Sequence, residues 1–369
     1  MKKINYNVAL ISFYQVRNSY NGASEVSLSL YNSITCINKK LFEIKNPEFF
    51  FKNQKLVNYI NSFFLKPIKI VEQFFLLKKY FKNKKNKIVI VEGASWIGYS
   101  FFFIKIFKII QRDAIIIYHA HNIEYDIRKI KNNKLIILLS KYFEKKVYED
   151  ADHATVVSKI DQKKIYKLYR KRATIFYNGI SKNRLKEKKG KKLNYKYIIF
   201  SGNYFYYPNQ IAIERLTKIL FKKINQKFKN IKLIITGSEL PKKILYNNKN
   251  IIFMKKLSKM NLNYLIKNSI CTILPLIKSP GTKLKVIEAL LLGKIIIGSK
   301  QAFDGIDCLS KKPPFICENL NKMIYYLNII LKKPKHYNFR ANDYKKYYQD
   351  KYLMENIWNR FCIDKSIIQ

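Results

Sequence analysis

Residues 281–299 decide the fold of this chain, and they read GTKLKVIEALLLGKIIIGS. The leading glycine predicts a tight turn, the apolar spacing after it predicts a helix, and the isoleucines at 295–297 predict a buried strand. A helix that opens on a glycine turn presents unpaired N–H groups and its positive dipole end to an anion. Lys283 and Lys285 add positive charge there, and Glu288, about one turn later, offers a carboxylate to hydroxyl groups. The segment suits the phosphates and ribose of a sugar nucleotide, although an ordinary helix with solvated lysines has the same pattern.

Strand and helix patterns alternate on both sides of this segment. Short apolar runs predict strands at 7–13, 88–91, 114–118, 154–157 and 174–177, and again at 197–200, 231–236, 251–254, 271–274, 295–297 and 315–317. Helices are expected at 24–34, 96–111, 135–149, 161–169, 208–228 and 344–362. Such alternation indicates parallel α/β sheets, which bind ligands at the carboxyl ends of their strands.

The chain divides into two such series. At 369 residues it is long for one core, and residues 183–196 are polar and lysine-rich with no apolar period. We therefore expect an N-terminal domain at 1–182, a linker at 183–196 and a C-terminal domain at 197–343. A helical segment at 344–369 is expected to pack back across the domains. Two domains of this kind in tandem create a cleft between them.

The formal charge of +48, from 72 basic and 24 acidic residues, is extreme. It favours an anionic partner such as nucleic acid, a membrane surface or an anionic ligand. Most of the basic residues are Lys, and the chain is also rich in Ile, Asn, Tyr and Phe, which all have A/T-rich codons. Genome composition is therefore an equal explanation. Because Arg is preferred for bidentate recognition of phosphates and bases, its scarcity argues against specific nucleic-acid binding.

Cysteine usage and hydropathy favour a cytoplasmic protein. Five scattered cysteines lack metal or redox spacing, so free thiols in a reducing compartment are expected. The N-terminal apolar stretch is too short for a signal peptide, and no run of about 18 uncharged apolar residues occurs. Segments 63–80 and 96–110 mix Lys with Phe, Ile and Leu. They fit either amphipathic faces on an anionic membrane or a core with lysines outside.

Seven short motifs follow one another in a specific order. They are NGA at 21–23, HNIE at 121–124, TVVS at 155–158, YNGI at 177–180, SGNY at 201–204 followed by Pro208 and Asn209, TKLKVIEA at 282–289 with Gly293, and FDGI at 303–306. In this order and spacing they resemble the family 4 retaining glycosyltransferases. The resemblance runs along most of the chain.

This resemblance implies an α/β protein of the GT-B fold, in which two Rossmann-like domains face each other across a cleft. The N-terminal domain would lie on the acceptor side, and the C-terminal domain would bind the nucleotide sugar. The implied enzyme is a hexosyltransferase-like protein without metal or cofactor. It would transfer a sugar with retention from a nucleoside diphosphate sugar to a glycan or lipid-linked acceptor, at the inner face of the cell membrane, in cell-surface polysaccharide or glycolipid synthesis. His121 is the implied catalytic residue, and the implied donor-binding residues are Gly22, Asn203, Gly281, Thr282, Lys283, Leu284, Lys285 and Glu288.

Two departures from the family pattern affect the donor site. Family members often have a Glu eight residues before the position of Glu288, where this chain has Pro280. Many also have an Arg and a Lys after the first strand of the donor domain, where this chain has Asn203 and Pro208. The two lysines at the helix start would then have to supply charge for the diphosphate.

Other polar residues have weaker assignments. His119 and His121 end a strand; His121 is favoured as a site residue because it matches the motif, and a structural hydrogen bond is the alternative. Glu124 is interpreted as a residue that starts a helix. Asp150 and Asp152 are interpreted as a polar turn. No His, Cys, Asp or Glu cluster has metal spacing in the sequence, so no metal is expected.

Two other functions are compatible with these features. A sugar-nucleotide epimerase shares the fold and would form product without an acceptor. A non-catalytic basic protein that binds membrane or nucleic acid would fail to bind a donor nucleotide, and its affinity for any polyanion would follow charge alone.

Overall fold

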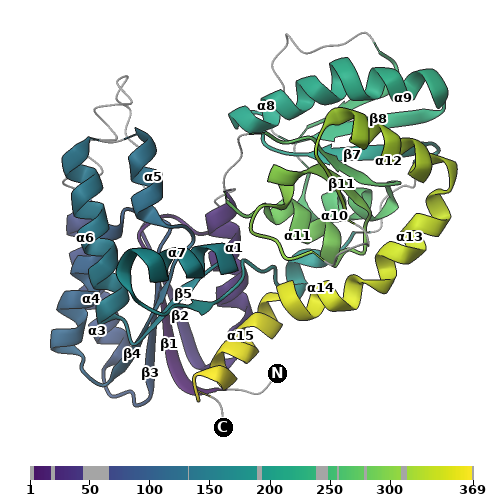
Figure 1. Ribbon diagram of the computed structural model, residues 1–369. Helices are drawn as coiled ribbons and strands as arrows, with labels where there is room; N and C mark the ends of the chain where they lie inside the picture. Colours follow the sequence, from purple (N-terminus) through teal and green to yellow (C-terminus); the bar gives the residue numbers. More distant parts are fainter. Residues whose placement is uncertain are drawn as a thin grey trace. The chain divides into compact units, whose positions relative to one another are not determined.

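The computed structural model of the chain describes residues 4–17, 21–44, 66–131, 133–188, 193–237, 248–255, 257–277, 281–308 and 314–367 (Figure 1). The chain forms two compact units. The first comprises Met1–Asn178 with Ile357–Gln369, and the second comprises Gly179–Asn356. Pro280, residues 63–65 and part of the expected linker lie outside the described residues.

The first unit is a parallel sheet covered by helices. Its described strands are β1 (Ile4–Ser12), β2 (Cys36–Glu43), β3 (Lys87–Glu92), β4 (Ala114–His119), β5 (His153–Val156) and β6 (Thr174–Ile175), in the order β2-β1-β3-β4-β5-β6. Neighbouring strands pair in parallel throughout. Its described helices are α1 (Gly22–Ser33), α3 (Lys66–Phe81), α4 (Ile97–Ile110), α5 (Glu124–Lys131), α6 (Lys134–Asp150), α7 (Lys159–Tyr169) and α15 (Met354–Asp364), which begins in the second unit.

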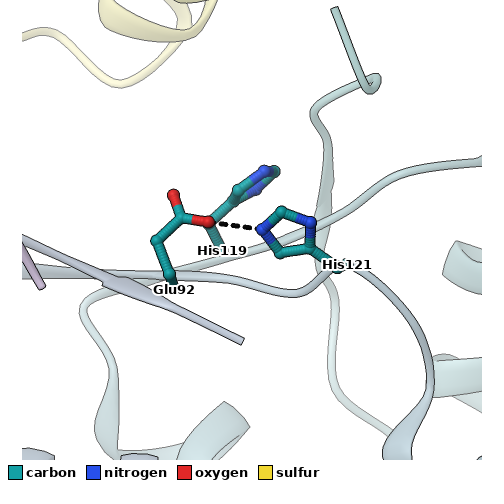
Figure 2. A group of neighbouring side chains, drawn as sticks. All are labelled: Glu92, His119 and His121. Carbon is teal, nitrogen blue, oxygen red and sulfur yellow. Dashed lines mark hydrogen bonds and ion pairs between the residues drawn. The ribbon is translucent and has the colours of Figure 1, made fainter. Parts of the chain in front are cut away.

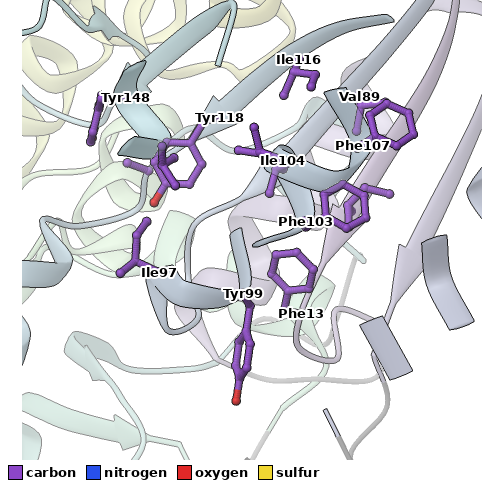
Figure 3. Packing of buried hydrophobic residues seen from close by; sticks show 14 of the residues in the cluster. Phe13, Val89, Ile97, Tyr99, Phe103, Ile104, Phe107, Ile116, Tyr118 and Tyr148 are labelled. Atoms are coloured by element: carbon purple, nitrogen blue, oxygen red, sulfur yellow. The ribbon is translucent and has the colours of Figure 1, made fainter. Parts of the chain in front are cut away.

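The core of the first unit lies between the sheet and α4. Every residue of β3 is buried, as expected for a parallel strand covered on both faces. Phe103 and Phe107 of α4 stack on each other with ring centroids 5.8 Å apart (Figure 3), and Phe74 of α3 packs edge-on against both rings. This packing fixes β3 and β4, whose carboxyl ends carry Glu92 and His119.

The second unit repeats the architecture. Its described strands are β7 (Lys196–Ser201), β8 (Ile231–Thr236), β9 (Ile251–Met254), β10 (Thr272–Leu274), β11 (Ile296–Ser299) and β12 (Phe315–Cys317), in the order β12-β11-β10-β7-β8-β9, again all parallel. Its described helical segments are η2 (Lys182–Leu185), α8 (Tyr207–Glu214), the π-helical η3 (Arg215–Leu220), α9 (Phe221–Lys227), α10 (Lys259–Asn268), α11 (Leu284–Leu291), η5 (Lys300–Phe303), α12 (Leu320–Lys332), α13 (Pro334–Asp343) and α14 (Lys345–Tyr352). The predicted turn, helix and strand at 281–299 correspond to the residues before α11, α11 itself and β11.

The C-terminal segment has a break that its apolar pattern does not show. The sequence predicts one helix at 344–362, whereas the structure has α14 and α15 divided at Leu353. Leu353 is extended because its backbone pairs with Ile180. Trp358 and Phe361 of α15 are buried as part of the first unit. The last helix of the chain therefore belongs to the unit that the N-terminus begins.

The five cysteines are free thiols, as their spacing predicts. None of the described helices is both long enough and apolar enough to cross a bilayer.

Candidate functional site

Each sheet has a point where the strand order reverses, and α/β sheets bind ligands there, at the carboxyl ends of the strands. In the first unit this switch point lies between β1 and β3, and in the second it lies between β7 and β10. Gly22 and His121 belong to the first unit. Asn203 and the 281–288 segment belong to the second, and both follow strands at its switch point.

The turn before α11 has the form that the sequence predicts. Gly281 has a φ of 76°, a left-handed conformation that favours glycine. Thr282 follows it, and the amine of Lys283 donates to the carbonyl of Gly281 across the turn. The helix begins at Leu284, and among the described residues no side chain caps it. The N–H groups of its first two positions have no hydrogen-bond partner within the described residues, so they and the positive dipole end can face an anion.

Burial lowers the pKa of both lysines at this helix start. The pKa of Lys283 falls to about 8 and that of Lys285 to about 7, because burial disfavours the charged amine, and the charge of Lys283 lowers the pKa of Lys285 further. An anion bound at the helix start would favour the charged form of both. Perturbed lysines of this kind gather at functional sites.

Lys285 connects α11 to the loop after β7. Its Nζ donates to the carbonyl of Ser201 at 3.1 Å and to Oδ1 of Asn209 at 2.8 Å. The side-chain amide of Asn209 in turn donates to the carbonyl of Asn203 at 2.7 Å. The structure thus brings Lys285 and Asn203 into one network. Lys285 has a structural task here, besides any contact with a ligand.

Glycines allow this loop to lie close to the neighbouring strand. A Cβ placed on Gly237, at the end of β8, would lie 1.9 Å from the carbonyl oxygen of Gly202. A Cβ on Gly202 would lie 2.9 Å from the side chain of Asn209. The approach therefore requires glycine at position 237, whereas a Cβ at position 202 would displace the Asn209 side chain from its hydrogen bonds.

Glu288 lies on α11 between two cations. It forms an ion pair with Lys259 of α10, and its side chain is 12% exposed. Arg184 of η2 is the second cation: burial lowers its pKa, and the nearby charge of Glu288 raises it in part. A carboxylate accepts up to about four hydrogen bonds, so Glu288 can keep Lys259 and still accept from the hydroxyls of a ribose.

Gly22 is exposed at the start of α1, in the first unit. The Asn21 side chain caps this helix by accepting the N–H of Ser24 at 2.9 Å. Unlike the start of α11, this helix start already has one donor satisfied. The assignment of Gly22 to donor binding stays a prediction.

Three titratable side chains meet at the carboxyl ends of β3 and β4, as Figure 2 shows: Glu92, His119 and His121. They are 0%, 1% and 5% exposed. The parallel pairing of the strands sets Glu92 directly beside His119. The ring of His121 follows two residues later, with its centroid 4.9 Å from that of His119.

Glu92 is an ionised carboxylate surrounded by donors. Its Oε2 accepts hydrogen bonds from Nε2 of His121 and from the hydroxyl of Ser27, the latter at 2.6 Å. Burial raises the pKa of Glu92, but the two histidines and these hydrogen bonds outweigh burial and hold the pKa below its usual value. The Tyr14 hydroxyl lies 2.6 Å from the Ser27 oxygen. A chain of polar groups therefore connects Tyr14 to His121.

His119 is neutral, because burial lowers its pKa to about 4. Its Nδ1 lies 2.8 Å from the hydroxyl oxygen of Thr155, which also lies 3.3 Å from the carbonyl oxygen of Tyr118. A hydrogen on Nδ1 lets this hydroxyl accept from the ring and donate to the carbonyl at the same time. Within the described residues, neither Nε2 of His119 nor Oε1 of Glu92 has a hydrogen-bond partner.

The structure brings together one group that could hold a metal ion and that sequence spacing does not show, while the absence of a bound metal stays a prediction. Glu92, His119 and His121 each offer one ligand atom, and these atoms lie within 4.8 Å of one another. Two imidazoles and a carboxylate are ligands that suit Zn²⁺. Sequence spacing did not show the group because Glu92 comes from a different strand and meets the histidines only through the β3–β4 pairing.

The carboxylates that the sequence analysis did not assign to the site form structural contacts. Asp150 and Asp152 form ion pairs with Lys105 and Lys108 of α4. Asp152 also accepts the N–H of Ile116 at 2.8 Å. These contacts are those of a polar turn that joins a helix to a strand. Glu124 is the first residue of α5 and forms an ion pair with Arg128, one turn later in the same helix.

Sequence reasoning missed Glu92, Ser27 and Lys259. Glu92 had a usable signal, because it directly follows the continuous apolar run at 88–91 and precedes a glycine, where a buried parallel strand ends. Ser27 and Lys259 had none, since a serine within a helix and one lysine among many resemble any other.

Residues 195–318, about a third of the chain, match the family model described as Glycosyl transferases group 1. The match covers the strands β7 to β12 and the whole of the 281–299 segment. It confirms the resemblance to glycosyltransferases over this part of the chain. No curated protein sequence is significantly similar to the chain.

Solved structures with the same fold cover almost the whole chain. Sucrose-phosphate synthase from Thermosynechococcus elongatus has a TM-score of 0.68 at 13% identity, with 98% of each chain covered. HepE from Anabaena, in complex with UDP and glucose, has a TM-score of 0.65 at 11% identity, covering 99% of this chain and 100% of its own. A glycosyltransferase from Rickettsia africae has a TM-score of 0.62 at 12% identity, with 98% of each covered. The fold is GT-B, built from two Rossmann-like units, as the sequence predicts.

Proposed function

We propose that this chain, whose second unit carries the glycosyl transferases group 1 segment, transfers a sugar from a nucleoside diphosphate sugar to a hydroxyl group. The observation that carries the proposal is the uncapped start of α11 at the switch point of the second sheet, inside the matched segment. It combines free N–H groups, a dipole end and two lysines on one side with a carboxylate one turn later.

In this proposal the diphosphate of the donor binds at Gly281–Leu284, and Glu288 accepts hydrogen bonds from the ribose hydroxyls. Lys283 lies in the turn itself and adds charge next to the phosphates. Lys285 reaches the diphosphate only if its amine leaves Ser201 and Asn209, so we assign it first to positioning the loop. The UDP and glucose in HepE, which has the same fold, support a nucleotide sugar as the donor.

The chemistry that this site supports is stabilisation of the leaving group. The bond between the anomeric carbon and the phosphate oxygen breaks, its electron pair stays on that oxygen, and negative charge grows there. The N–H groups and dipole of α11 and the nearby lysine stabilise that charge. The acceptor hydroxyl forms the new bond to the anomeric carbon, and its proton passes to the departing phosphate. Attack from the same face retains the configuration.

We further propose that transfer proceeds without a metal, because the helix start and Lys283 supply the positive charge that a metal would otherwise provide. The three-residue group at Glu92 belongs to the first unit and is not assigned to the diphosphate. Transfer in excess chelator at the full rate is therefore expected.

The acceptor is proposed to be lipid-linked, because the first unit has an exposed apolar face. We call the outer sides of α3, α4 and α6 the apolar outer face; its exposed large residues are Ile68, Val71, Phe75, Leu76, Phe102, Ile106, Ile109, Ile110, Leu135, Leu138, Leu139 and Tyr142. The three helices pack side by side, through Phe74 with Phe103 and through Phe101 with Phe143. Apolar side chains among exposed lysines are typical of proteins that lie on an anionic membrane.

Nucleotide binding followed by transfer tests the proposal. Titration calorimetry with UDP, GDP, ADP and CDP should show one that binds, and the matching nucleotide sugar should then glycosylate an acceptor. Product formed from the nucleotide sugar without any acceptor would instead indicate an epimerase. Failure of every nucleoside diphosphate to bind, together with polyanion binding that follows charge alone, would contradict an enzyme of either kind.

A further inference from the structure

We infer that Glu92 is a positioning residue for His121. It holds the hydrogen of the His121 ring on Nε2 and so leaves the Nδ1 lone pair to accept a hydrogen bond from a hydroxyl group of a bound sugar. The sugar as ligand rests on the proposed function, whereas the tautomer rests only on the hydrogen bonds around Glu92.

The tautomer follows from the donors and acceptors at Glu92. An ionised carboxylate only accepts hydrogen bonds, so the Nε2 that contacts its Oε2 must carry the hydrogen. In the neutral form of His121, this is the one ring hydrogen, so the lone pair is on Nδ1. Within the described residues, Nε2 is the nitrogen of His121 that has a hydrogen-bond partner. His119, beside it, contacts the hydroxyl of Thr155 through Nδ1, so the two rings have different hydrogen-bond partners.

The position of Glu92 is fixed from both sides of the switch point. It ends β3, where the N–H of Gly93 donates to the carbonyl of His119 at 2.8 Å and holds the ends of β3 and β4 together. Ser27 attaches the carboxylate to α1, the helix that follows β1. A group held by two elements keeps its rotamer, which is what a residue needs to orient a neighbour.

Glu92→Gln separates this role from simple packing. The glutamine side chain has the same shape, but its amide can donate as well as accept, so it no longer requires the hydrogen on Nε2 of His121. The Nδ1–H tautomer should become populated. We expect kcat for transfer to fall about 10- to 100-fold, the range for one hydrogen bond to a charged group. The affinity for nucleoside diphosphate, which depends on α11 in the second unit, should change less than about threefold.

Glu144→Gln is the matched control. Glu144 of α6 is also a buried glutamate of the first unit, and it accepts the N–H groups of Glu124 and Tyr125 at the start of α5. It has no hydrogen bond to either histidine of the group within the described residues. This variant should leave the tautomer of His121 unchanged, even if it lowers stability.

The measurement is nitrogen–proton correlation spectroscopy of the histidine rings in the full chain, labelled with ¹⁵N-histidine. The chain has four histidines, and His121→Gln identifies the signals of His121. The inference is supported if His121 is the Nε2–H tautomer in the wild type, Glu92→Gln changes it, and kcat falls while nucleotide affinity holds.

Three results would overturn the inference. The first is a His121 tautomer that does not respond to Glu92→Gln. The second is a changed tautomer with full kcat. The third is one equivalent of zinc that the purified chain retains and the Glu92→Gln variant loses, because the three ligand atoms would then bind an ion in place of the hydrogen. If the wild type transfers no sugar at all, the proposed function fails, and the ring spectra still decide whether Glu92 sets the tautomer.

Discussion

The amine of Lys285 lies between the carbonyl of Ser201, the side-chain oxygen of Asn209 and the ring of Phe200, three groups without formal charge. Such surroundings satisfy its hydrogen bonds but do little to stabilise a positive charge, which is why burial lowers its pKa so far. Burial also lowers the pKa of Lys283, in the turn before the helix. The two residues closest to the proposed diphosphate therefore change charge near neutral pH.

Donor binding should take up protons. With a pKa of about 8 for Lys283 and about 7 for Lys285, both amines lose their charge in the free protein as the pH rises through this range. A bound diphosphate favours the charged amines, so the affinity for nucleoside diphosphate should fall from about pH 6 to about pH 9. Calorimetry in buffers of different ionisation enthalpy measures the uptake directly. Binding with no proton uptake near pH 8 would exclude both lysines from the diphosphate.

The effect of the same lysines on stability has the opposite sign. The unfolded chain keeps these amines protonated up to their ordinary pKa of 10.5, whereas the folded chain has already released the protons. The unfolded state therefore binds more protons between about pH 7 and about pH 10.5, and these two residues make the free energy of unfolding rise with pH in that window.

Glu288→Ala should weaken nucleoside diphosphate binding by about 1.5–3 kcal/mol, or roughly 10- to 150-fold, since a charged hydrogen-bond acceptor for the ribose is lost. Lys259→Ala is the control, because it removes the ion pair but keeps the carboxylate. Calorimetry should show that this second variant binds no more weakly than the wild type. Equal losses in both variants would mean that the ion pair shapes the site and that the ribose contact is absent.

At the scale of elements, α4 has two different sides. Its inner side carries Phe103 and Phe107 into the core, and its outer side exposes Phe102, at 50%, and Ile109, at 68%. The aromatic residues of the predicted membrane segments are thus divided between core and surface. The apolar outer face consists mainly of Ile, Leu and Val, whose side chains can enter a membrane interface without requiring hydrogen bonds.

Replacing Phe102, Ile106 and Ile109 together by Ser should release the chain from anionic vesicles. These side chains are exposed, so the fold should be retained, while the lost apolar burial should lower partitioning by at least about tenfold. Flotation with vesicles containing phosphatidylglycerol at low and moderate salt is the measurement. Phe339→Ser is the control, because Phe339 is 70% exposed on α13 of the second unit. Wild-type protein that stays in the soluble fraction with both neutral and anionic vesicles would reject the membrane role.

The sequence predicted most strands because buried parallel strands are continuous apolar runs, whereas it did not predict α10, α12 and α13 and predicted only the start of α5. β2 was missed because it is an edge strand with polar and lysine residues at 38–40. Among its residues, only Leu41 and Phe42 are fully buried. The helix predicted at 208–228 exists but contains the π-helical η3, which apolar spacing does not distinguish from an α-helix. At the site, helix start and histidines could be predicted from local motifs. The partner of His121 could not, because strand pairing alone brings Glu92 to it.

At the scale of the whole molecule, the first unit is made from both ends of the chain. The ring of Phe361 packs edge-on against Phe176, just beyond β6, at a centroid distance of 5.6 Å. Trp358 is 1% exposed. The last helix thus supplies core residues to a sheet whose strands all come from the first half of the sequence.

Deleting residues 357–369 should destabilise the first unit and spare the second. Losing two buried aromatic side chains removes about 3–6 kcal/mol, a large part of the stability of a typical domain. Hydrogen exchange should show lost protection in β1 and β3 to β6, with β7 to β12 still protected. Ile363→Ser, on the exposed side of α15, is the control that keeps the helix. Equal loss of protection in both units would contradict this division of the chain.

The late position of α15 also affects the order in which the two units can fold during synthesis. A ribosome has made every residue of the second unit when it passes position 356, whereas Trp358 and Phe361 of the first unit come later. The unit whose strands are made first is therefore completed last. A nascent chain that has just passed position 356 has all residues of the second unit, while its first unit still lacks two core side chains.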